Sequence, residues 1–195
     1  MSHYFETPER GGQPRTLTLR LGERRLPLRT ETGVFSRDRI DPGTGILLEA
    51  MPPPPEAGDL LDLGCGYGPI SLALATASPE ATVWAVDVNE LALELCRRNA
   101  EAAGVTNVRV CAPDAVPPEV RFAGIWSNPP IRIGKEPLHV LLLDWLGRLG
   151  EAAAATLVVQ RHLGSDSLQT WLEESGFRTE RIASRKGYRV LRCHR

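Results

Sequence analysis

The sequence predicts an α/β fold in which a mainly parallel sheet is covered by helices on both faces. Between residues 59 and 175, short apolar runs alternate with longer segments of helical period. A glycine-rich turn, Asp62-Leu-Gly-Cys-Gly-Tyr-Gly68, follows the first of these runs. The last two strand-like segments, 177–183 and 188–193, have no helix between them, so they predict an antiparallel pair at one edge of the sheet.

The N-terminal part predicts a hairpin followed by a helix. Residues 16–30 alternate between apolar and polar side chains around a turn at Gly22, and Pro27 would keep its strand at an edge. A helical segment runs from Asp41 to about Met51, where four consecutive prolines at 52–55 end it. This rigid tract divides the chain into an N-terminal extension and a main domain.

The main domain, residues 56–195, follows the extension of residues 1–55 and contains the alternating elements. Apolar runs bounded by turn residues predict the strands, and segments of ten or more residues with helical period predict the helices. The expected strands are 59–63, 82–87, 107–111, 122–127 and 155–160. The expected helices are 68–77, 89–103, 136–149 and 165–175.

Length and composition are those of an ordinary globular protein. Of 195 residues, 42% are hydrophobic and 24% are charged, and this size fits one domain with a substantial core. No apolar stretch approaches the roughly 20 residues of a membrane helix, and the first residues lack the features of a secretory signal. We therefore expect a cytoplasmic protein with no membrane partner.

The cysteines predict neither disulfides nor a metal site, because they form no CxxC pair and lie far apart. They are Cys65, Cys96, Cys111 and Cys193. The net charge of -1 conceals two basic ends around an acidic middle. Residues 176–195 hold seven Arg or Lys against one Glu, and residues 1–40 hold eight Arg against five acids. Such ends fit an anionic partner, and they equally fit a solvated surface.

The glycine-rich turn predicts a ligand site, because Gly64, Gly66 and Gly68 let a ligand approach the backbone closely. A dinucleotide is disfavoured, since Pro69 stands where the third glycine of G-x-G-x-x-G belongs. No Gly-Lys-Ser/Thr follows, so the turn is not a P-loop. The acid Asp62 suits a ligand that bears a cation. The alternative is a glycine-rich turn without a ligand.

Two further acids lie at the ends of the next strands. Asp87 ends the second strand about 20 residues after the turn, where a carboxylate can accept both ribose hydroxyls. Alternatively, Asp87 or Asn89 caps the following helix. Asp114 follows the third strand, where it can meet an adenine amino group or serve as a turn residue.

Ser127-Asn128-Pro129-Pro130, at the end of strand 122–127, predicts a site for an amino group on an aromatic ring. Such an amine is a poor nucleophile, so it must be held where its lone pair reaches the electrophile. The oxygens of Asn128 and Pro129 can accept its two N–H bonds, and proline rigidity fixes them. No general base of tuned pKa is required, because the amine becomes acidic once it has reacted. The alternative is an ordinary Asn-Pro turn.

These motifs together resemble the class I S-adenosylmethionine-dependent methyltransferases, and within them the small-subunit ribosomal RNA guanine-N2 methyltransferase family. The subfamily resemblance is carried by residues 33–45, 127–139 and 186–191. It implies a Rossmann-like sheet of about seven strands with a reversed last strand, and S-adenosyl-L-methionine as cofactor. It also implies RNA as the partner, and leaves the oligomeric state open.

The resemblance implies a role for each matching residue. The cofactor-binding set is Asp62, Gly64, Cys65, Gly66, Gly68, Asp87, Val88, Asp114 and Asn128. The catalytic set is Asn128, Pro129 and Pro130, and the substrate-binding set is Phe35, Arg39, Ile131, Arg132, Lys135 and Tyr188. Two departures stand out: Ile131 replaces an aromatic residue found in many amino-methylating members, and the extra N-terminal domain of better-known guanine-N2 members is reduced to about 30 residues.

These departures shape the expected substrate contacts. Phe35 or Tyr188 would stack on the base in place of the missing aromatic. Arg132 and Lys135 would bind flanking phosphates, with Arg185, Lys186 and Arg189 extending that track, unless they are plain surface charges. The expected activity is methylation of a guanine amine in ribosomal RNA. The alternatives are a protein glutamine amide, a DNA adenine, or a non-catalytic cofactor-binding subunit.

Overall fold

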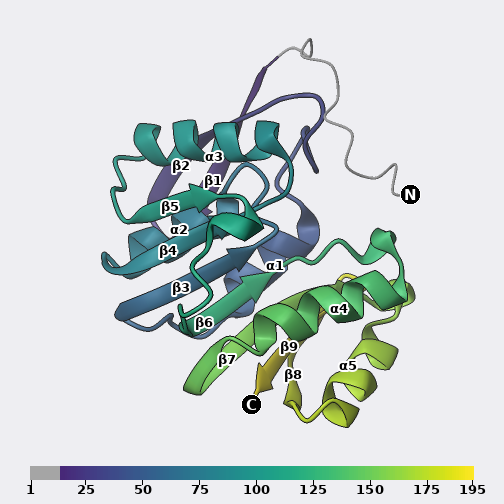
Figure 1. Ribbon diagram of the computed structural model, residues 1–195. Helices are drawn as coiled ribbons and strands as arrows, with labels where there is room; N and C mark the ends of the chain where they lie inside the picture. The colour runs from purple at the N-terminus through teal and green to yellow at the C-terminus, as the bar shows by residue number, and fades with distance from the viewer. Residues whose placement is uncertain (1–13) are drawn as a thin grey trace.

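The computed structural model describes residues 14–195, in which nine strands and five α-helices form two sheets and their covering layers (Figure 1). The strands are β1 (Arg15–Leu21), β2 (Arg24–Thr30), β3 (Ala57–Leu63), β4 (Glu80–Val86), β5 (Val108–Cys111), β6 (Phe122–Ser127), β7 (Leu149–Gln160), β8 (Arg178–Arg185) and β9 (Tyr188–His194). The helices are α1 (Pro42–Ala50), α2 (Pro69–Ala77), α3 (Glu90–Ala102), α4 (Lys135–Leu146) and α5 (Ser165–Glu174).

The main sheet has seven strands in the order β5-β4-β3-β6-β7-β9-β8. Strands β3 to β7 pair in parallel, whereas β9 pairs antiparallel with both β7 and β8. The turn between β8 and β9 contains only Lys186 and Gly187, which is too short for the crossover that a parallel pair needs. The predicted α/β class, the reversed last strand and the antiparallel edge pair are confirmed.

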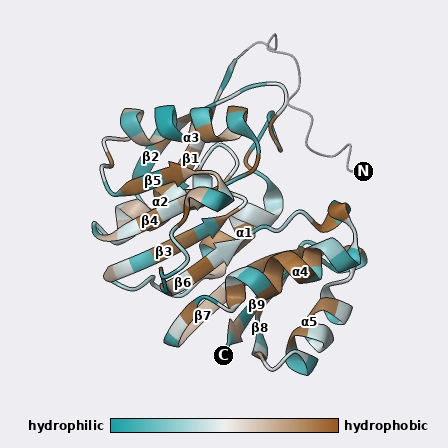
Figure 2. Cartoon of the chain, viewed as in Figure 1, coloured by the Kyte–Doolittle hydropathy of each residue, from teal (hydrophilic) through white to brown (hydrophobic). Residues whose placement is uncertain are grey.

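Helices cover both faces of this sheet. Helices α4 and α5 pack on one face through residues such as Leu142, and α1 and α2 pack on the other through residues such as Leu47. Adjacent residues of β3 face opposite layers, since Leu61 packs with α4 and Leu60 with α1, and both are fully buried. A strand buried on both faces reads as a continuous apolar run. Figure 2 shows hydrophobic residues gathered along such strands and along α4.

The predicted hairpin is confirmed and forms a small sheet of its own, β1 and β2. Leu19 and Leu28 on its inner face pack against Tyr67, Leu72 and Leu95, which belong to the glycine-rich turn, α2 and α3. The alternation of apolar and polar residues in the sequence therefore reflects one face packed on the main domain and one face open to solvent.

The buried side chain of Asn99 joins the hairpin to the main domain. Its amide oxygen accepts from the backbone N–H of Arg29, and its amide nitrogen donates to the carbonyls of Arg29 and Tyr67. The predicted helix α1 is also confirmed, and it packs on the main sheet. The division of the chain at residue 55 stays a prediction, and residues 1–13 of the predicted extension lie outside the described residues.

Two predicted boundaries were wrong at the start of β7. The strand begins at Leu149 and not at residue 155, and α4 ends at Leu146 and not at residue 149. Alanines 152–155 favour helix intrinsically and lack the bulky side chains by which strands are recognised. The pairing with β6 is also irregular there, and Ala152 has a positive φ of 59°.

Within residues 14–195, every helix is too short or too polar to cross a membrane.

Candidate active site at the carboxyl edge of the sheet

The glycine-rich turn and the Asn-Pro-Pro segment lie beside each other because β3 and β6 are neighbours in the sheet. Since β3, β4 and β6 are parallel, the residues that follow them gather at one edge (Figure 1). The side chain of Ser127 ties two of these ends together, because its hydroxyl donates to the carbonyl of Leu63 at 2.7 Å. The segments 64–68, 87–89 and 128–130 therefore share one edge.

Glycine is required in the turn for two different structural reasons. Gly64 and Gly66 have φ values of 77° and 55°, and a Cβ on either would meet no atom within 4 Å, so open space lies over them. A Cβ on Gly68 would lie 2.7 Å from the sulfur of Cys96 and 2.9 Å from Leu72. Gly68 therefore permits close packing of the turn against α2 and α3, whereas Gly64 and Gly66 leave room for a ligand.

Asp62 is a buried carboxylate with one unpaired oxygen. Its Oδ2 accepts from the hydroxyl of Ser71 at 2.5 Å, and its Oδ1 has no partner among the described residues. Burial raises the pKa of Asp62 to about 7; the Ser71 hydrogen bonds lower that pKa and the charge of Asp87 raises it further. An unpaired buried oxygen favours a hydrogen-bond donor or a cation as its partner.

Asp87 braces the turn and does not cap α3. One of its oxygens accepts from the backbone N–H of Gly66 at 2.8 Å, and the other accepts from that of Asn89 at 2.9 Å. The cap of α3 is Asn89, whose amide oxygen accepts from the N–H groups of Leu91 and Ala92. The helix-capping alternative for Asp87 is therefore wrong. The carboxylate of Asp87 keeps lone pairs that can accept further hydrogen bonds.

The other predicted cofactor residues line the same edge or its surroundings. Val88, which follows Asp87, is exposed by 55% although it is apolar. Asp114 is exposed in a short 3-10 helix, Pro113–Ala115, directly after β5. Cys65 is buried against Cys96, and burial raises the pKa of its thiol well above the ordinary value. This environment disfavours a thiolate nucleophile.

Asn128 is held by its amide nitrogen, which donates to the Oδ1 of Asp41 at 2.8 Å and to the hydroxyl of Thr44 at 3.1 Å. Within residues 14–195, all side-chain hydrogen bonds of Asn128 are made by that nitrogen, so the amide oxygen remains able to accept a hydrogen bond. Sequence reasoning missed Asp41 and Thr44 as site residues. There, Asp41 was assigned only to the start of a helix, because it stands just before Pro42, and to the segment 33–45 that carries the subfamily resemblance.

The carbonyl of Pro129 is already engaged. It accepts from the N–H of Ile131 at 2.8 Å, and Pro130 between them has φ -75° and ψ 72°, which is an inverse γ-turn. A carbonyl has two lone pairs, so one remains for a further donor. The turn holds this carbonyl next to Asn128.

The predicted substrate residues differ in exposure. Phe35 is exposed by 67%, and Arg39, Arg132 and Lys135 are also exposed. Ile131 is half-buried and packs against the core on the α4 face. Tyr188 is half-buried and lies against α1, where a Cβ on Gly43 would be 2.8 Å from its ring.

The members of the predicted phosphate track differ in exposure. The side chain of Arg189 lies against Asp166 and is only 12% exposed, and its place in the track stays a prediction. Arg185 pairs with Glu49 at 3.2 Å, but both side chains are largely exposed, and such pairs are weak. Lys186 is exposed in the turn between β8 and β9.

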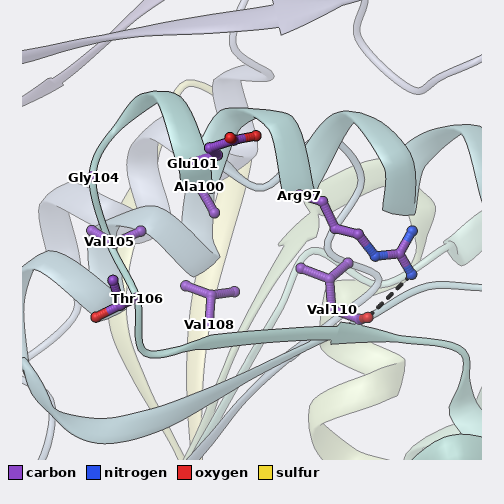
Figure 3. A pocket seen from close by; sticks show the side chains of 8 residues that line it. All are labelled: Arg97, Ala100, Glu101, Gly104, Val105, Thr106, Val108 and Val110. Atoms are coloured by element: carbon purple, nitrogen blue, oxygen red, sulfur yellow. Dashed lines mark hydrogen bonds between the residues drawn. The ribbon is translucent and has the colours of Figure 1, made fainter.

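A cavity of about 520 Å³ lies between α3 and β5, away from these residues (Figure 3). It is lined by Val108, Val110 and the second half of α3, and the guanidinium of Arg97 borders it and donates to the carbonyl of Val110. Helix α3 begins beside Asp87 and runs away from the edge. This cavity contains none of the predicted site residues.

Comparison with known proteins identifies relatives of this chain among methyltransferases. Residues 25–192 match the family model of the methyltransferase small domain. The uncharacterised protein YbxB of Bacillus subtilis is 34% identical over 194 residues, which are 98% of this chain and 96% of that protein. Ribosomal RNA small subunit methyltransferase C of Stutzerimonas stutzeri is 35% identical over 86% of this chain, which spans only 54% of its length.

A solved structure shows the same architecture. The 16S rRNA N2 G1207 methyltransferase of T. thermophilus, in complex with AdoMet and guanosine, matches 97% of this chain with a TM-score of 0.83 and 25% identity. This chain spans 53% of that one. A precorrin-6y C5,15-methyltransferase from Geobacter metallireducens, at 15% identity and a TM-score of 0.64, shares the fold. The chain therefore belongs to the methyltransferase small domain family, and it is a class I S-adenosylmethionine-dependent methyltransferase, as its motifs predicted.

Proposed function

We propose that this chain methylates the exocyclic amine of a guanine in ribosomal RNA, with S-adenosyl-L-methionine as the methyl donor. The observation that carries the proposal is the amide of Asn128, whose nitrogen is held by the protein and whose oxygen is left for a donor beside the glycine-rich turn. The names of the relatives support a ribosomal RNA target, and the guanosine bound to the T. thermophilus enzyme supports guanine.

The residues at the edge fit the proposed cofactor. The space over Gly64 and Gly66 admits a ligand, and the unpaired oxygen of Asp62 suits its ammonium or sulfonium charge. The free lone pairs of Asp87 would accept the ribose hydroxyls, while Val88 would contact the adenine and Asp114 would accept its amino group. When bound, the cofactor supplies a methyl group activated by the adjacent positive sulfur.

The target loop would hold the amine for attack on that methyl group. The Asn128 oxygen and the second lone pair of the Pro129 carbonyl would accept the two N–H bonds, which turns the nitrogen lone pair toward the methyl carbon. As the N–C bond forms, the C–S bond would break and its electron pair would go to sulfur, which leaves as a neutral thioether. Nitrogen becomes positive, and both acceptors then bind more strongly to its hydrogens. A proton then leaves to solvent, so no side chain has to serve as a base.

Exposed cations around the edge suit a polyanionic substrate. Arg39, Arg132, Lys135 and Lys186 come from three separate segments, and none of them forms an ion pair within residues 14–195. Phe35 offers an exposed aromatic ring for stacking on a base drawn out of its helix. These side chains would bind phosphate and base, while Asn128 reads the amine.

Transfer of labelled methyl groups tests this proposal. We expect the purified chain to label small-subunit ribosomal RNA from cells that lack it, and nucleoside mass mapping to find the label on the guanine N2 position. Label that survives nuclease but not protease would indicate a protein amide, and label in DNA adenine would indicate the other alternative. Either result, with no label in RNA, would overturn the RNA assignment and leave methyl transfer intact.

A further inference from the structure

The amide nitrogen of Asn128 has two acceptors at the N-terminus of helix α1. Its two N–H bonds are matched by the Oδ1 of Asp41, at 2.8 Å, and the hydroxyl oxygen of Thr44, at 3.1 Å. The same Asp41 oxygen accepts from the backbone N–H of Thr44 at 3.0 Å and so caps α1. The first turn of α1 and the target loop are thus parts of one hydrogen-bonded unit.

This pairing determines which way the Asn128 amide faces. An Asn side chain can rotate by half a turn and exchange its oxygen and nitrogen at little steric cost. Here such a rotation would place the amide oxygen against the Asp41 carboxylate, which cannot donate a hydrogen bond, and the two would repel. The negative charge of Asp41 therefore keeps the nitrogen on the α1 side and the oxygen on the opposite side.

Asp41 is itself closely surrounded. A Cβ on Gly43 would lie 2.9 Å from the Asp41 Oδ1 and 2.8 Å from the ring of Tyr188, so the helix start, Asp41 and β9 are in close contact. Burial and the negative charge of Asp41 raise the pKa of Tyr188. Thr44 is 95% buried and has little freedom to turn its hydroxyl away.

We propose that Asp41 and Thr44 are positioning residues that set the orientation of the Asn128 amide and thereby make the site select an N–H donor. The inference rests on the proposed role of Asn128 toward the target amine. The hydrogen bond from the Asn128 nitrogen to the Asp41 carboxylate also polarises the Asn128 amide, which makes the Asn128 oxygen a stronger acceptor. This helps that oxygen to hold the target amine as the amine nitrogen turns positive. A carbonyl or an unprotonated ring nitrogen of a base would meet the same oxygen and be rejected.

The first test compares Asp41→Asn with Thr44→Val in the full chain. The Asp41→Asn side chain still offers an oxygen to cap α1, because Asn and Asp are equally good caps, but it lacks the negative charge that penalises rotation of Asn128. We expect the kcat of methyl transfer to fall on the order of 100-fold, as when a reacting group is misplaced. The KM for RNA and the calorimetric Kd for the cofactor should stay within about twofold, because neither is set mainly by Asn128.

Thr44→Val removes one acceptor while keeping the shape of the side chain, and Thr44→Ser restores a hydroxyl. We expect a smaller loss of kcat in Thr44→Ser than in Thr44→Val. If Asp41→Asn unfolds, these two variants decide the question. A purely structural role for α1 predicts equal kcat in Thr44→Ser and Thr44→Val at equal thermal stability, and that result would overturn the inference.

The reciprocal exchange provides the sharpest test. Asn128→Asp alone places two carboxylates in contact, so transfer should be lost. When Asp41→Asn is added, rotation of the amide introduced at position 41 lets its nitrogen donate to the carboxylate introduced at position 128, although this gives up the hydrogen bond that the Asp41 Oδ1 accepts from the N–H of Thr44. The other oxygen of that carboxylate is then left for the amine, so kcat should recover at least tenfold over the single Asn128→Asp variant. A double variant no more active than that single variant would contradict the pairing.

The two proposals fail in different ways. If Asn128→Ala retains transfer, Asn128 does not hold the amine and the proposed function itself fails at this residue. If Asn128→Ala is inactive but Asp41→Asn and Thr44→Val transfer at the parent rate, only the positioning role is lost. Calorimetric cofactor binding, which is measured without RNA, shows that each variant still folds around its site.

Discussion

The two halves of the site are held in different ways. The glycine-rich turn is braced by neighbours in the chain, since Asp62 bonds to Ser71 and Asp87 bonds to Gly66, 9 and 21 residues apart. Asn128 instead depends on Asp41 and Thr44, which are 87 and 84 residues away. The partners that hold the cofactor half are thus much closer in the chain, whereas the target half exists only once α1 and β6 have packed together.

The largest effect on methyl transfer should come from Asn128→Ala. This variant changes the target half and leaves the residues that brace the glycine-rich turn in place. We expect methyl transfer to fall roughly 100- to 1000-fold, the usual loss when a preorganised polar group facing the reacting atoms is deleted. Cofactor affinity measured by calorimetry should stay within about twofold, because the turn is braced independently. A parallel loss of cofactor binding would mean that the halves are not separable.

Asp62 should make the cofactor half sensitive to pH. Its pKa of about 7 in the chain without cofactor means that the side chain is protonated at lower pH. A cationic ligand favours the carboxylate, so affinity should fall about tenfold for each pH unit below 7. Calorimetry between pH 5 and 8 measures this slope, and Asp62→Asn should abolish it. A slope that persists in Asp62→Asn would assign the titration to another group.

The same pKa shift predicts a stability effect of opposite sign to that of an ordinary ion pair. Because the pKa of Asp62 is higher in the folded chain than its usual 3.8, stability is fully present below about pH 4 and is lost as the pH rises through about 7. Asp62→Asn should therefore melt at a higher temperature than the parent at pH 8 without cofactor. Thermal unfolding should show that difference disappearing near pH 4.

Two glycines of the turn should separate folding from binding. Gly68→Ala forces a Cβ against Cys96 and Leu72 and should destabilise the fold by about 2 kcal/mol or more, seen as a lower Tm. Gly64→Ala meets open space, so its folding penalty is limited to about 1 kcal/mol from the positive φ. Its added methyl group should weaken cofactor binding more than tenfold. Equal effects on Tm and affinity in both variants would contradict the distinction.

The smallest effect should lie on the RNA side of the target half. Phe35→Ala should raise the KM for RNA about tenfold, since stacking of a base on an aromatic side chain contributes roughly 1–3 kcal/mol. Neither Tm nor cofactor affinity should change, because the ring is exposed. Val140→Ala, at a similarly exposed apolar position on α4, serves as the control and should leave KM unaltered.

The predicted elements succeeded where their signal was local. The hairpin, α1 and the alternating strands and helices follow from side-chain period and from prolines and glycines at their ends. The start of β7 failed because its alanines carry no strand signal and only the pairing with β6 makes them a strand. The low exposure of Arg189 could not be predicted, because Asp166, against which it lies, belongs to a different element.

By itself, the sequence determined the fold class, the antiparallel pair at the edge of the sheet and the turn that leaves room over Gly64 and Gly66. Each of these depends on residues close together in the chain, where period, turn chemistry and connection length act directly. Only the tertiary structure decided that Asp87 braces the turn and does not cap α3, and that Asp41 and Thr44 hold Asn128. Those contacts arise when buried helices and strands bring distant polar groups together, and a buried polar group must find a partner.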